Sequence, residues 1–272
     1  MRHRISSLDA EVMVGLDLQA HAESCWDFPR TNHSRVAREL GIDIVSGRLS
    51  ENSILPGDTE LLNRFRVSRT ILREALKTLS AKGLIEAKAK IGTRVLERRF
   101  WNMFDPSVLR WHAQAGTGPE FLLSLSEMRF SLESEAAALA ARRRSLHHVQ
   151  ELNRCVKLMQ RAEQSPEEFV NSDLLFHLAV AEASLNPFMR SISSLIEVAL
   201  VVTFQFSSPI PGSPDHRRVV DRHSAVANAI VDQNEKVARK AMQAVVQDSI
   251  DRLKTVKVRK RIKTGSSTSG TH

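Results

Sequence analysis

The sequence has 272 residues, enough for two ordinary domains, and 42% of them are hydrophobic, enough to build real cores. Its formal net charge of +8 makes an anionic partner worth testing. The two distant cysteines and the lack of an apolar run of about 20 residues argue against a disulfide framework, a zinc–cysteine cluster and a membrane span, and we expect a cytoplasmic protein.

The positive charge is concentrated in two segments of the chain. Residues 32–99 contain 14 Lys and Arg against 8 Asp and Glu, whereas residues 100–251 contain 15 against 18. Residues 252–272 contain 7 basic residues and no acidic one. A basic segment joined to a mildly acidic one is typical of a DNA-binding unit attached to a second domain. We therefore predict a flexible extension at 1–31, a DNA-binding domain at 32–99, a second domain at 100–256 and a disordered basic tail at 257–272.

The N-terminal third predicts three helices followed by a hairpin. After a short helix considered at Leu8–Leu18, hydrophobic spacing indicates helices at His33–Ser46, Thr59–Phe65 and Arg69–Lys82. Asp58 and Ser68 are the expected N-caps of the last two helices, and Gly83 closes the third. Short strands are expected at Leu84–Ala87 and Thr93–Leu96. Three helices and a hairpin, in this order, predict a winged helix-turn-helix.

The third of these helices presents basic residues on the side opposite its apolar face. Arg69, Arg73 and Lys77 follow one another at intervals of four residues, so they share one face of the helix. A helix fits the major groove of DNA, where Arg binds guanine or clamps phosphate. The alternative is a solvated face paired with Glu74. We expect DNA contacts from the helix and from the Gly-containing hairpin tip, made by Ser68, Arg69, Thr70, Arg73, Lys77, Lys90, Gly92 and Thr93.

The rest of the chain is expected to be helical, so the fold class is mainly α. The aromatic segment Phe100–Trp111 predicts a packed junction rather than a free tether. Prolines at several helix starts suit the first helical position, where no N–H is needed. The expected helices are Pro106–His112, Pro119–Arg143, Leu146–Gln164, Pro166–Ala183, Pro187–Phe206, Asp215–Asp232 and Glu235–Val256.

Two polar pairs stand on these otherwise apolar helices. Arg129 and Glu133 lie one turn apart and form either a simple ion pair or a site in which the Arg binds a carboxylate ligand. Asp173 and His177 are also one turn apart, so one helix face offers an oxygen and an imidazole to a single point. His223 follows two helices later. These five residues are the predicted effector-binding set.

The N-terminal motifs resemble the GntR family of transcription factors. The resemblance is carried by Leu55-Pro56-Gly57-Asp58, by the run from Val67 to Leu76, by Gly83-Leu84-Ile85 and by Gly92-Thr93-Arg94-Val95. It implies that Arg69, Thr70 and Arg73 contact operator DNA and that the Gly92 tip enters the minor groove. Many members carry a DNA-contacting Arg where this chain has Thr59, so its operator preference is expected to differ.

The helical part resembles the FCD domain of the FadR subgroup, and in particular regulators of D-galactonate and related sugar acids. Its motifs are the segments 101–111, 126–133 and 186–187. The resemblance implies a divalent metal such as Zn²⁺, held here by Asp173, His177 and His223. The expected fourth ligand falls at Val245, which cannot coordinate a metal. The alternative is a metal-free pocket whose polar groups bind the effector directly.

Together these features predict a homodimeric, sequence-specific repressor that a small carboxylate, a sugar acid, releases from operator DNA. The sequence contains no nucleophile elbow, phosphate-binding glycine loop or HExxH motif, so we do not expect an enzyme. Two alternatives were weighed. One is a metal-dependent enzyme fused to a DNA-binding head, and the other is a non-specific architectural DNA-binding protein, which would not need a large near-neutral helical domain.

Overall fold

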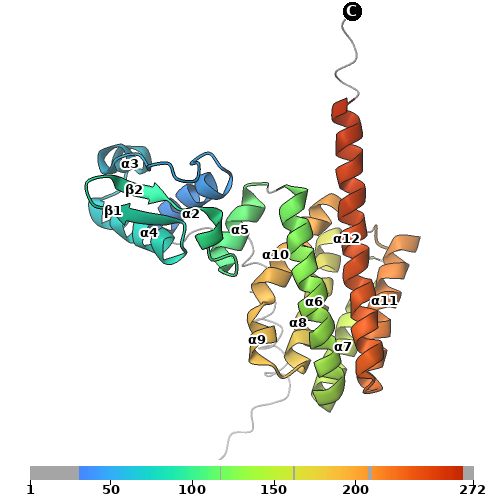
Figure 1. The fold of residues 1–272 in the computed structure, drawn as a ribbon. Helices are drawn as coiled ribbons and strands as arrows, with labels where there is room; N and C mark the ends of the chain where they lie inside the picture. Colours follow the sequence, from blue (N-terminus) through green and yellow to red (C-terminus); the bar gives the residue numbers. More distant parts are fainter. Residues whose placement is uncertain (1–30, 117, 162, 208–209, 266–272) are drawn as a thin grey trace, which may run out of the picture. The chain divides into compact units, whose positions relative to one another are not determined.

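The computed structural model describes residues 31–116, 118–161, 163–207 and 210–265. The chain divides into two compact units, an N-terminal unit up to residue 117 and a C-terminal unit from residue 118 (Figure 1). The helix considered at Leu8–Leu18 lies outside the described residues. In the described part of the chain, no helix is long and apolar enough to cross a membrane.

The N-terminal unit has the predicted order of three helices and a hairpin. Its helices are α2 (Asn32–Val45), α3 (Asp58–Phe65) and α4 (Arg69–Ala81). Thr31 caps α2 by accepting a hydrogen bond from the Ser34 N–H, and Ser68 caps α4 by accepting one from the Ile71 N–H. We expected Asp58 to be the N-cap of α3, but Gly57 is the N-cap. The helix begins one residue earlier than predicted, so Asp58 is its first residue. Its carboxylate then lies in the first turn, where the helix dipole favours negative charge.

The hairpin is a two-stranded antiparallel wing. Strand β1 (Ile85–Lys88) pairs with β2 (Gly92–Val95), with Ile85 opposite Val95 and Lys88 opposite Gly92. The sequence did not indicate that any other segment pairs with the two strands of the wing, but the chain just before α3 runs along β2. There the Leu55 N–H donates to the Thr93 carbonyl at 2.8 Å. This pairing ties the wing to the helices.

The aromatic junction belongs to the N-terminal unit, so the predicted boundary at residue 100 is too early. Helix α5 (Pro106–Gln114) places Val108 and Trp111 in the same core as α2 and α4. Trp101 is buried there as well, and its indole N–H donates to the Leu96 carbonyl. These large side chains bury more apolar surface in that core than they could in an open linker. The boundary between the two units therefore lies between residues 117 and 118.

The C-terminal unit is entirely helical in its described residues. Helices α6 and α12 pack side by side along it, and α11 packs against α12 (Figure 1). Prolines occupy the first turn of α5, α6, α8, α9 and α11, as the sequence predicted. The helices are α6 (Pro119–Arg143), α7 (Leu146–Met159), α8 (Pro166–Ala183), α9 (Pro187–Ser191), α10 (Ser193–Ser207), α11 (Pro214–Val231) and α12 (Glu235–Gly265).

Three of the expected helices differ from the structure. The expected helix Leu146–Gln164 ends at Met159, whose carbonyl accepts a hydrogen bond from the Gln164 side chain instead of continuing the helix. The expected helix Pro187–Phe206 is broken at Ile192, where three serines cluster and the Ser191 hydroxyl donates to the Pro187 carbonyl. Serine hydroxyls compete for backbone groups and weaken helices. Helix α12 does not end at Val256 but continues to Gly265, so part of the tail predicted to be disordered is helical. The reason is that Lys and Arg favour helix, and no Gly or Pro interrupts this segment before Gly265.

Candidate functional site

The basic face of α4 is exposed in the N-terminal unit. Leu72, Ala75 and Leu79 point into the core, and this leaves the opposite side of the helix to solvent. Ser68, at the N-cap, is exposed as well. The structure therefore places the predicted helix residues on one accessible face: Ser68, Arg69, Thr70, Arg73 and Lys77.

The basic residues of this face differ in their partners. Lys77 forms an ion pair with Glu74 at 2.8 Å, which was the alternative considered from the sequence. No ion pair among the described residues involves Arg69 or Arg73. The two guanidinium groups are thus free to meet phosphate or a base edge, whereas Lys77 must first release Glu74.

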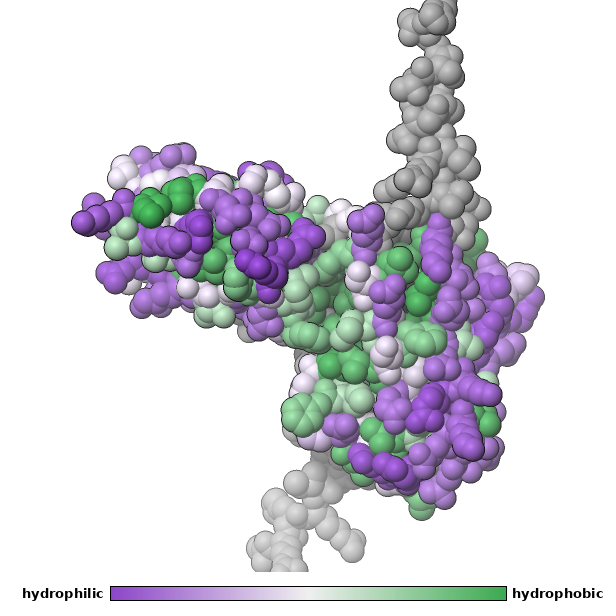
Figure 2. All heavy atoms as spheres, viewed as in Figure 1, coloured by the Kyte–Doolittle hydropathy of each residue, from purple (hydrophilic) through white to green (hydrophobic). Residues whose placement is uncertain are grey.

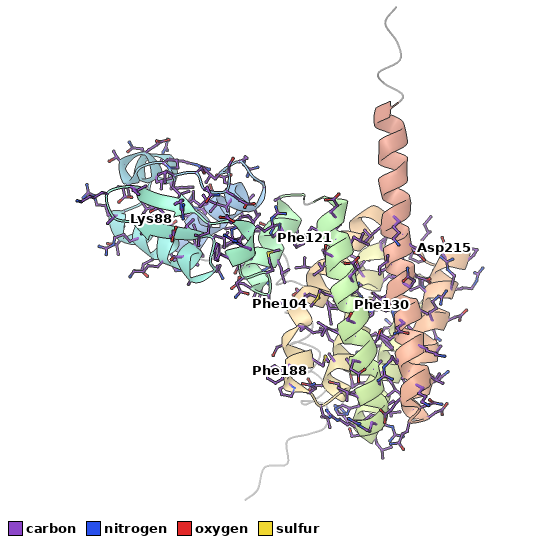
Figure 3. The ribbon with its side chains drawn as sticks, in the orientation of Figure 1. Lys88, Phe104, Phe121, Phe130, Phe188 and Asp215 are labelled. Carbon is purple, nitrogen blue, oxygen red and sulfur yellow. The ribbon has the colours of Figure 1, made fainter. Side chains whose placement is uncertain are left out.

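The wing supplies the second predicted group of DNA contacts. Lys90 (φ 64°) lies in the turn between the strands and Gly92 (φ 113°) begins β2, and both are exposed. Glycine suits this backbone conformation and also lets the strand end approach another surface closely. Thr93 is half-buried because it lies on β2 opposite Ala87. Lys88, on the neighbouring strand, adds a further amine near the tip (Figure 3).

Helix α3 has Thr59 at the position where many members of the GntR family carry an arginine that contacts DNA. Thr59 is exposed near its start, so the position is accessible, but a threonine has neither the reach nor the charge of an arginine.

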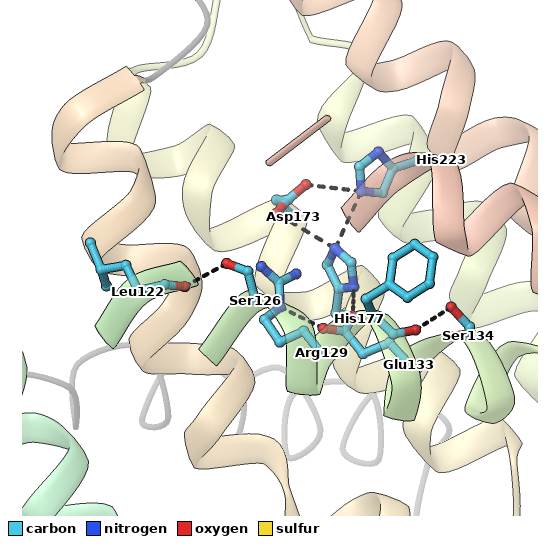
Figure 4. Close-up of polar contacts among 9 residues, drawn as sticks. Leu122, Ser126, Arg129, Glu133, Ser134, Asp173, His177 and His223 are labelled. Atoms are coloured by element: carbon cyan, nitrogen blue, oxygen red, sulfur yellow. Dashed lines mark hydrogen bonds and ion pairs between the residues drawn. The ribbon is translucent and has the colours of Figure 1, made fainter. Parts of the chain in front are cut away.

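The second site is a buried polar cluster inside the C-terminal unit (Figure 4). Asp173 and His177 share one face of α8, and His223 reaches them from α11. Oδ1 of Asp173 lies 3.0 Å from Nε2 of His223, and the Nε2 atoms of the two histidines lie 3.4 Å apart. The structure thus brings together all three residues of the predicted metal set, with their ligand atoms within 4.8 Å of one another.

The outer nitrogens of both imidazoles face groups that accept hydrogen bonds. Nδ1 of His177 contacts the Glu133 carboxylate, and Nδ1 of His223 lies 2.7 Å from the Val219 carbonyl oxygen. Each contact favours a proton on Nδ1 and leaves the lone pair of Nε2 directed at the other histidine and at Asp173. The two Nε2 atoms and the Asp173 carboxylate then all point acceptor lone pairs at one place, with no hydrogen-bond donor among them. A cation bound at that place would satisfy all three. The residues present therefore suit a divalent metal by the chemistry of their donors.

Arg129 and Glu133 extend this cluster from α6. Nε of Arg129 lies 2.5 Å from Oε1 of Glu133, and both side chains are almost fully buried. Burial alone would raise the pKa of Glu133, but the Arg129 guanidinium and the His177 imidazole outweigh it and lower the pKa to about 2. The carboxylate is therefore ionised, and Glu133 links the arginine to a histidine of the cluster.

Asp173 is ionised for a similar reason. Burial would raise the pKa of its carboxyl group, but His223, His177 and Arg129 together lower it to about 2. Its charge lies beside the two Nε2 atoms, where a cation would be stabilised most.

A small cavity of about 10 Å³ opens beside these residues, the volume of roughly one water molecule or ion. Val245 lines it from α12, at the place where the sequence led us to expect a further histidine. Sequence reasoning missed the other polar residues of the lining, although Asp248 and Arg252 follow Val245 at helical spacing on α12. The missed polar residues are Arg222, Asp248, Ser249 and Arg252.

Comparison with known proteins identifies both domains. Residues 32–95 match the model of bacterial regulatory proteins of the gntR family, and residues 124–248 match the FCD domain. YieP of Escherichia coli K12, named an uncharacterized HTH-type transcriptional regulator, is 32% identical over 214 residues, which cover 78% of this chain and 91% of YieP. The chain belongs to the GntR family of transcriptional regulators.

Further relatives of this GntR regulator carry functional names. The galactonate operon transcriptional repressor of E. coli K12 is 30% identical, with 82% of this chain and 96% of the repressor covered. LutR of Bacillus subtilis 168, an HTH-type transcriptional regulator, is 29% identical over 74% of this chain and 91% of its own length. These relatives are regulators of transcription, and the same holds for this chain, which is not an enzyme.

A solved structure supports the fold. The Listeria monocytogenes protein Lar, described as controlling the expression of the agr system, superposes with a TM-score of 0.59 at 18% identity. The match covers 84% of this chain and 99% of Lar. The predicted fold class, a winged helix-turn-helix followed by an all-helical FCD domain, is confirmed.

Proposed function

We propose that this regulator is a sequence-specific repressor that leaves its operator when a small carboxylate, a sugar acid, binds in the C-terminal unit. The observation that carries the proposal is Arg129. Its side chain is 1% exposed and it lines the cavity beside the histidine cluster, yet its Nη1 has no hydrogen-bond partner among the described residues. A buried guanidinium with a free N–H is an expensive arrangement that a carboxylate ligand relieves.

On the DNA side, α4 enters the major groove and the wing enters the minor groove. Arg69 and Arg73 read base edges or clamp phosphates, and Thr70 and Ser68 donate to the backbone. Lys77 contributes after it exchanges Glu74 for a phosphate. At the wing tip, Gly92 allows close approach, with Lys90 and Thr93 beside it.

The names of the relatives support an acid as the effector. One relative represses a galactonate operon, and another, 27% identical, is the activator of the glc operon of E. coli K12. Both signs of regulation thus occur among the relatives. We choose repression because the galactonate repressor matches at higher identity and over 96% of its own length, against 86% for the glc activator.

In the same pocket, Asp173, His177 and His223 would hold one divalent metal ion. The ion would supply a positive charge that binds a carboxylate oxygen of the effector. Glu133 and the Val219 carbonyl would fix the orientation and tautomer of the two histidines. The effector-binding set then consists of Arg129, Glu133 and these three residues.

The regulator acts as a homodimer in the cytoplasm, where its DNA is. One short recognition helix reads only a few base pairs, so two copies on a near-palindromic operator are needed for useful affinity. The effector changes operator binding only if it binds the DNA-bound and the released states with different affinity.

The DNA contacts are tested by selecting binding sites from random duplexes and measuring affinity by fluorescence anisotropy. Arg73→Ala is expected to lose about 1–3 kcal/mol per half-site, roughly tenfold or more in affinity, because a charged contact to DNA is removed. The matched control is Arg142→Ala, an exposed arginine at the end of α6, which should bind as the unchanged protein does. Wild-type affinity and selectivity in Arg73→Ala would show that α4 is not the reading helix.

The same assay tests release by adding three- to six-carbon hydroxy acids to the preformed complex. We expect at least one acid to lower operator affinity. If none does, and none binds the free protein, the proposed effector function is wrong.

A further inference from the structure

The cavity beside the histidine cluster is lined by a second arginine that has an N–H without a hydrogen-bond partner among the described residues. Arg252 lines the cavity from α12, and its Nε is buried without a hydrogen-bond partner among the described residues. The carboxylate one turn before it on the same helix is already engaged, because Asp248 forms an ion pair with Arg222 at 2.6 Å. Arg252 is therefore not needed to balance that charge.

Two guanidinium groups, one from α6 and one from α12, thus border one small buried space with donors to spare. Burial lowers the pKa of Arg252 below its usual range, and the positive charges of Arg218 and Arg129 lower it further, although Asp173 and Asp248 act against this. Like charges gathered in a buried cavity are costly unless an anion lies between them.

The charges around the cavity also indicate how many negative charges a ligand brings. Arg129, Arg222 and Arg252 are offset by Glu133, Asp173 and Asp248 when the histidines are neutral. A divalent ion held by the Asp173 cluster would leave two positive charges, which a dianion neutralises and a monoanion does not.

Arginines also line a second, open hollow on the surface of α11. Arg222 lines the cavity and also this hollow, together with Arg217 and Arg218. Hydrophilic residues cover this side of the unit in Figure 2, and Asp215 marks the start of α11 in Figure 3. Exposed arginines raise the local concentration of anions near the cavity.

We propose that the effector is a dianion of sugar-acid size, with one anionic group bound by Arg129 and the second by Arg252. The second group is a carboxylate, as in a sugar diacid, or a phosphate, as in a phosphorylated sugar acid, which brings a charge of about −1.5 to −2 instead of −1. Both sources share the chemistry that the arginines recognise. Since the cavity holds only about one water molecule, α12 or α11 must move outward to admit the ligand. The inference rests on the proposed function and narrows its ligand class.

Calorimetric titration of the full chain with three six-carbon acids tests this assignment. D-gluconate carries one anionic group, D-glucarate two carboxylates, and 6-phospho-D-gluconate a carboxylate and a phosphate. With zinc present, we expect at least one of the two acids with a second anionic group to bind about tenfold or more tightly than gluconate. Charge-assisted hydrogen bonds of about 1.5–3 kcal/mol correspond to about 10- to 100-fold in affinity.

Arg252→Gln is expected to remove this preference, so that the dianions bind no better than gluconate, while gluconate itself changes little. The matched control is Arg239→Gln, an arginine of the same helix that pairs with Glu135 at 2.8 Å and does not line the cavity. Circular dichroism shows whether each variant is folded. If a variant does not fold, the comparison of the three acids on the unchanged protein still tests the proposal.

The outcomes separate the two proposals. If gluconate binds as tightly as both dianions, or if Arg252→Gln weakens gluconate as much as the dianions, the dianion assignment is wrong and a monoanionic effector remains. If no hydroxy acid binds the unchanged protein, the proposed effector function fails, and the dianion assignment fails with it.

Discussion

At the residue scale, Val245 is the position where the proposed metal site lacks a fourth protein ligand. It lines the cavity where a fourth ligand is expected, and its isopropyl group offers no lone pair. Three protein ligands leave coordination positions for water or an effector oxygen, as in metal sites that act on a ligand. The valine thus makes the site weaker but more open.

Val245→His is predicted to raise the affinity for Zn²⁺ by about tenfold or more, because an imidazole then completes the protein ligand set. Competition with a chromogenic chelator measures the change. The control is Val237→His, the same substitution at an exposed position of α12. An affinity unchanged in a folded Val245→His variant would mean that this position does not face the metal.

At the element scale, the contact between α2 and α5 depends on one glycine. Gly41 lies inside α2, and a Cβ atom added there would come within 2.3 Å of the Trp111 ring. Real Cβ atoms essentially never approach so closely, so the indole of α5 packs directly on the backbone of α2. This contact is the reason why α5 belongs to the N-terminal unit.

Gly41→Ala is therefore predicted to destabilise the N-terminal unit by about 1–3 kcal/mol, the usual cost of overpacking. On helix propensity alone, alanine would stabilise an interior helical position by about 1 kcal/mol, so the sign of the change tests the packing. Urea unfolding followed by tryptophan fluorescence reports on Trp101 and Trp111. Gly57 is the N-cap of α3, and a Cβ added there meets nothing within 4 Å. The poorer N-cap and the lower entropy of the unfolded chain oppose each other, about 1 kcal/mol or less each, so Gly57→Ala should change stability by only a few tenths of a kcal/mol. A more stable Gly41→Ala variant would contradict this account.

At the scale of the whole molecule, the two units divide the work of a regulator. The N-terminal unit exposes unpaired arginines on α4, while the C-terminal unit buries its polar cluster away from solvent.

Several large apolar side chains of the second unit are nevertheless exposed. Phe188 on α9 is 80% exposed (Figure 3), and Leu185 just before it is 56% exposed. Exposed apolar residues of this size are typical of surfaces that meet another protein.

The full chain is predicted to be a dimer at micromolar concentration. Light scattering after size-exclusion chromatography should give twice the chain mass of 30.5 kDa. Operator affinity should also fall steeply as salt rises, because both copies displace counterions from phosphates. A mass of 30.5 kDa for the free chain, together with a complex that contains one chain per operator duplex, would rule out the dimer.

The sequence by itself predicted the winged helix and most of the C-terminal helices, because these follow from local spacing and capping. Spacing and family resemblance together supplied the candidate DNA, metal and effector residues, but not the other polar residues that line the cavity from α11 and α12. The exposed face of α4 and the one-turn pairs Arg129/Glu133 and Asp173/His177 needed only the period of a helix. Tertiary structure alone decided that α5 packs on Gly41, that His223 reaches Asp173, and that Arg252 borders the same cavity as Arg129. These contacts join residues far apart in the chain, and no local period encodes which helix faces are brought together.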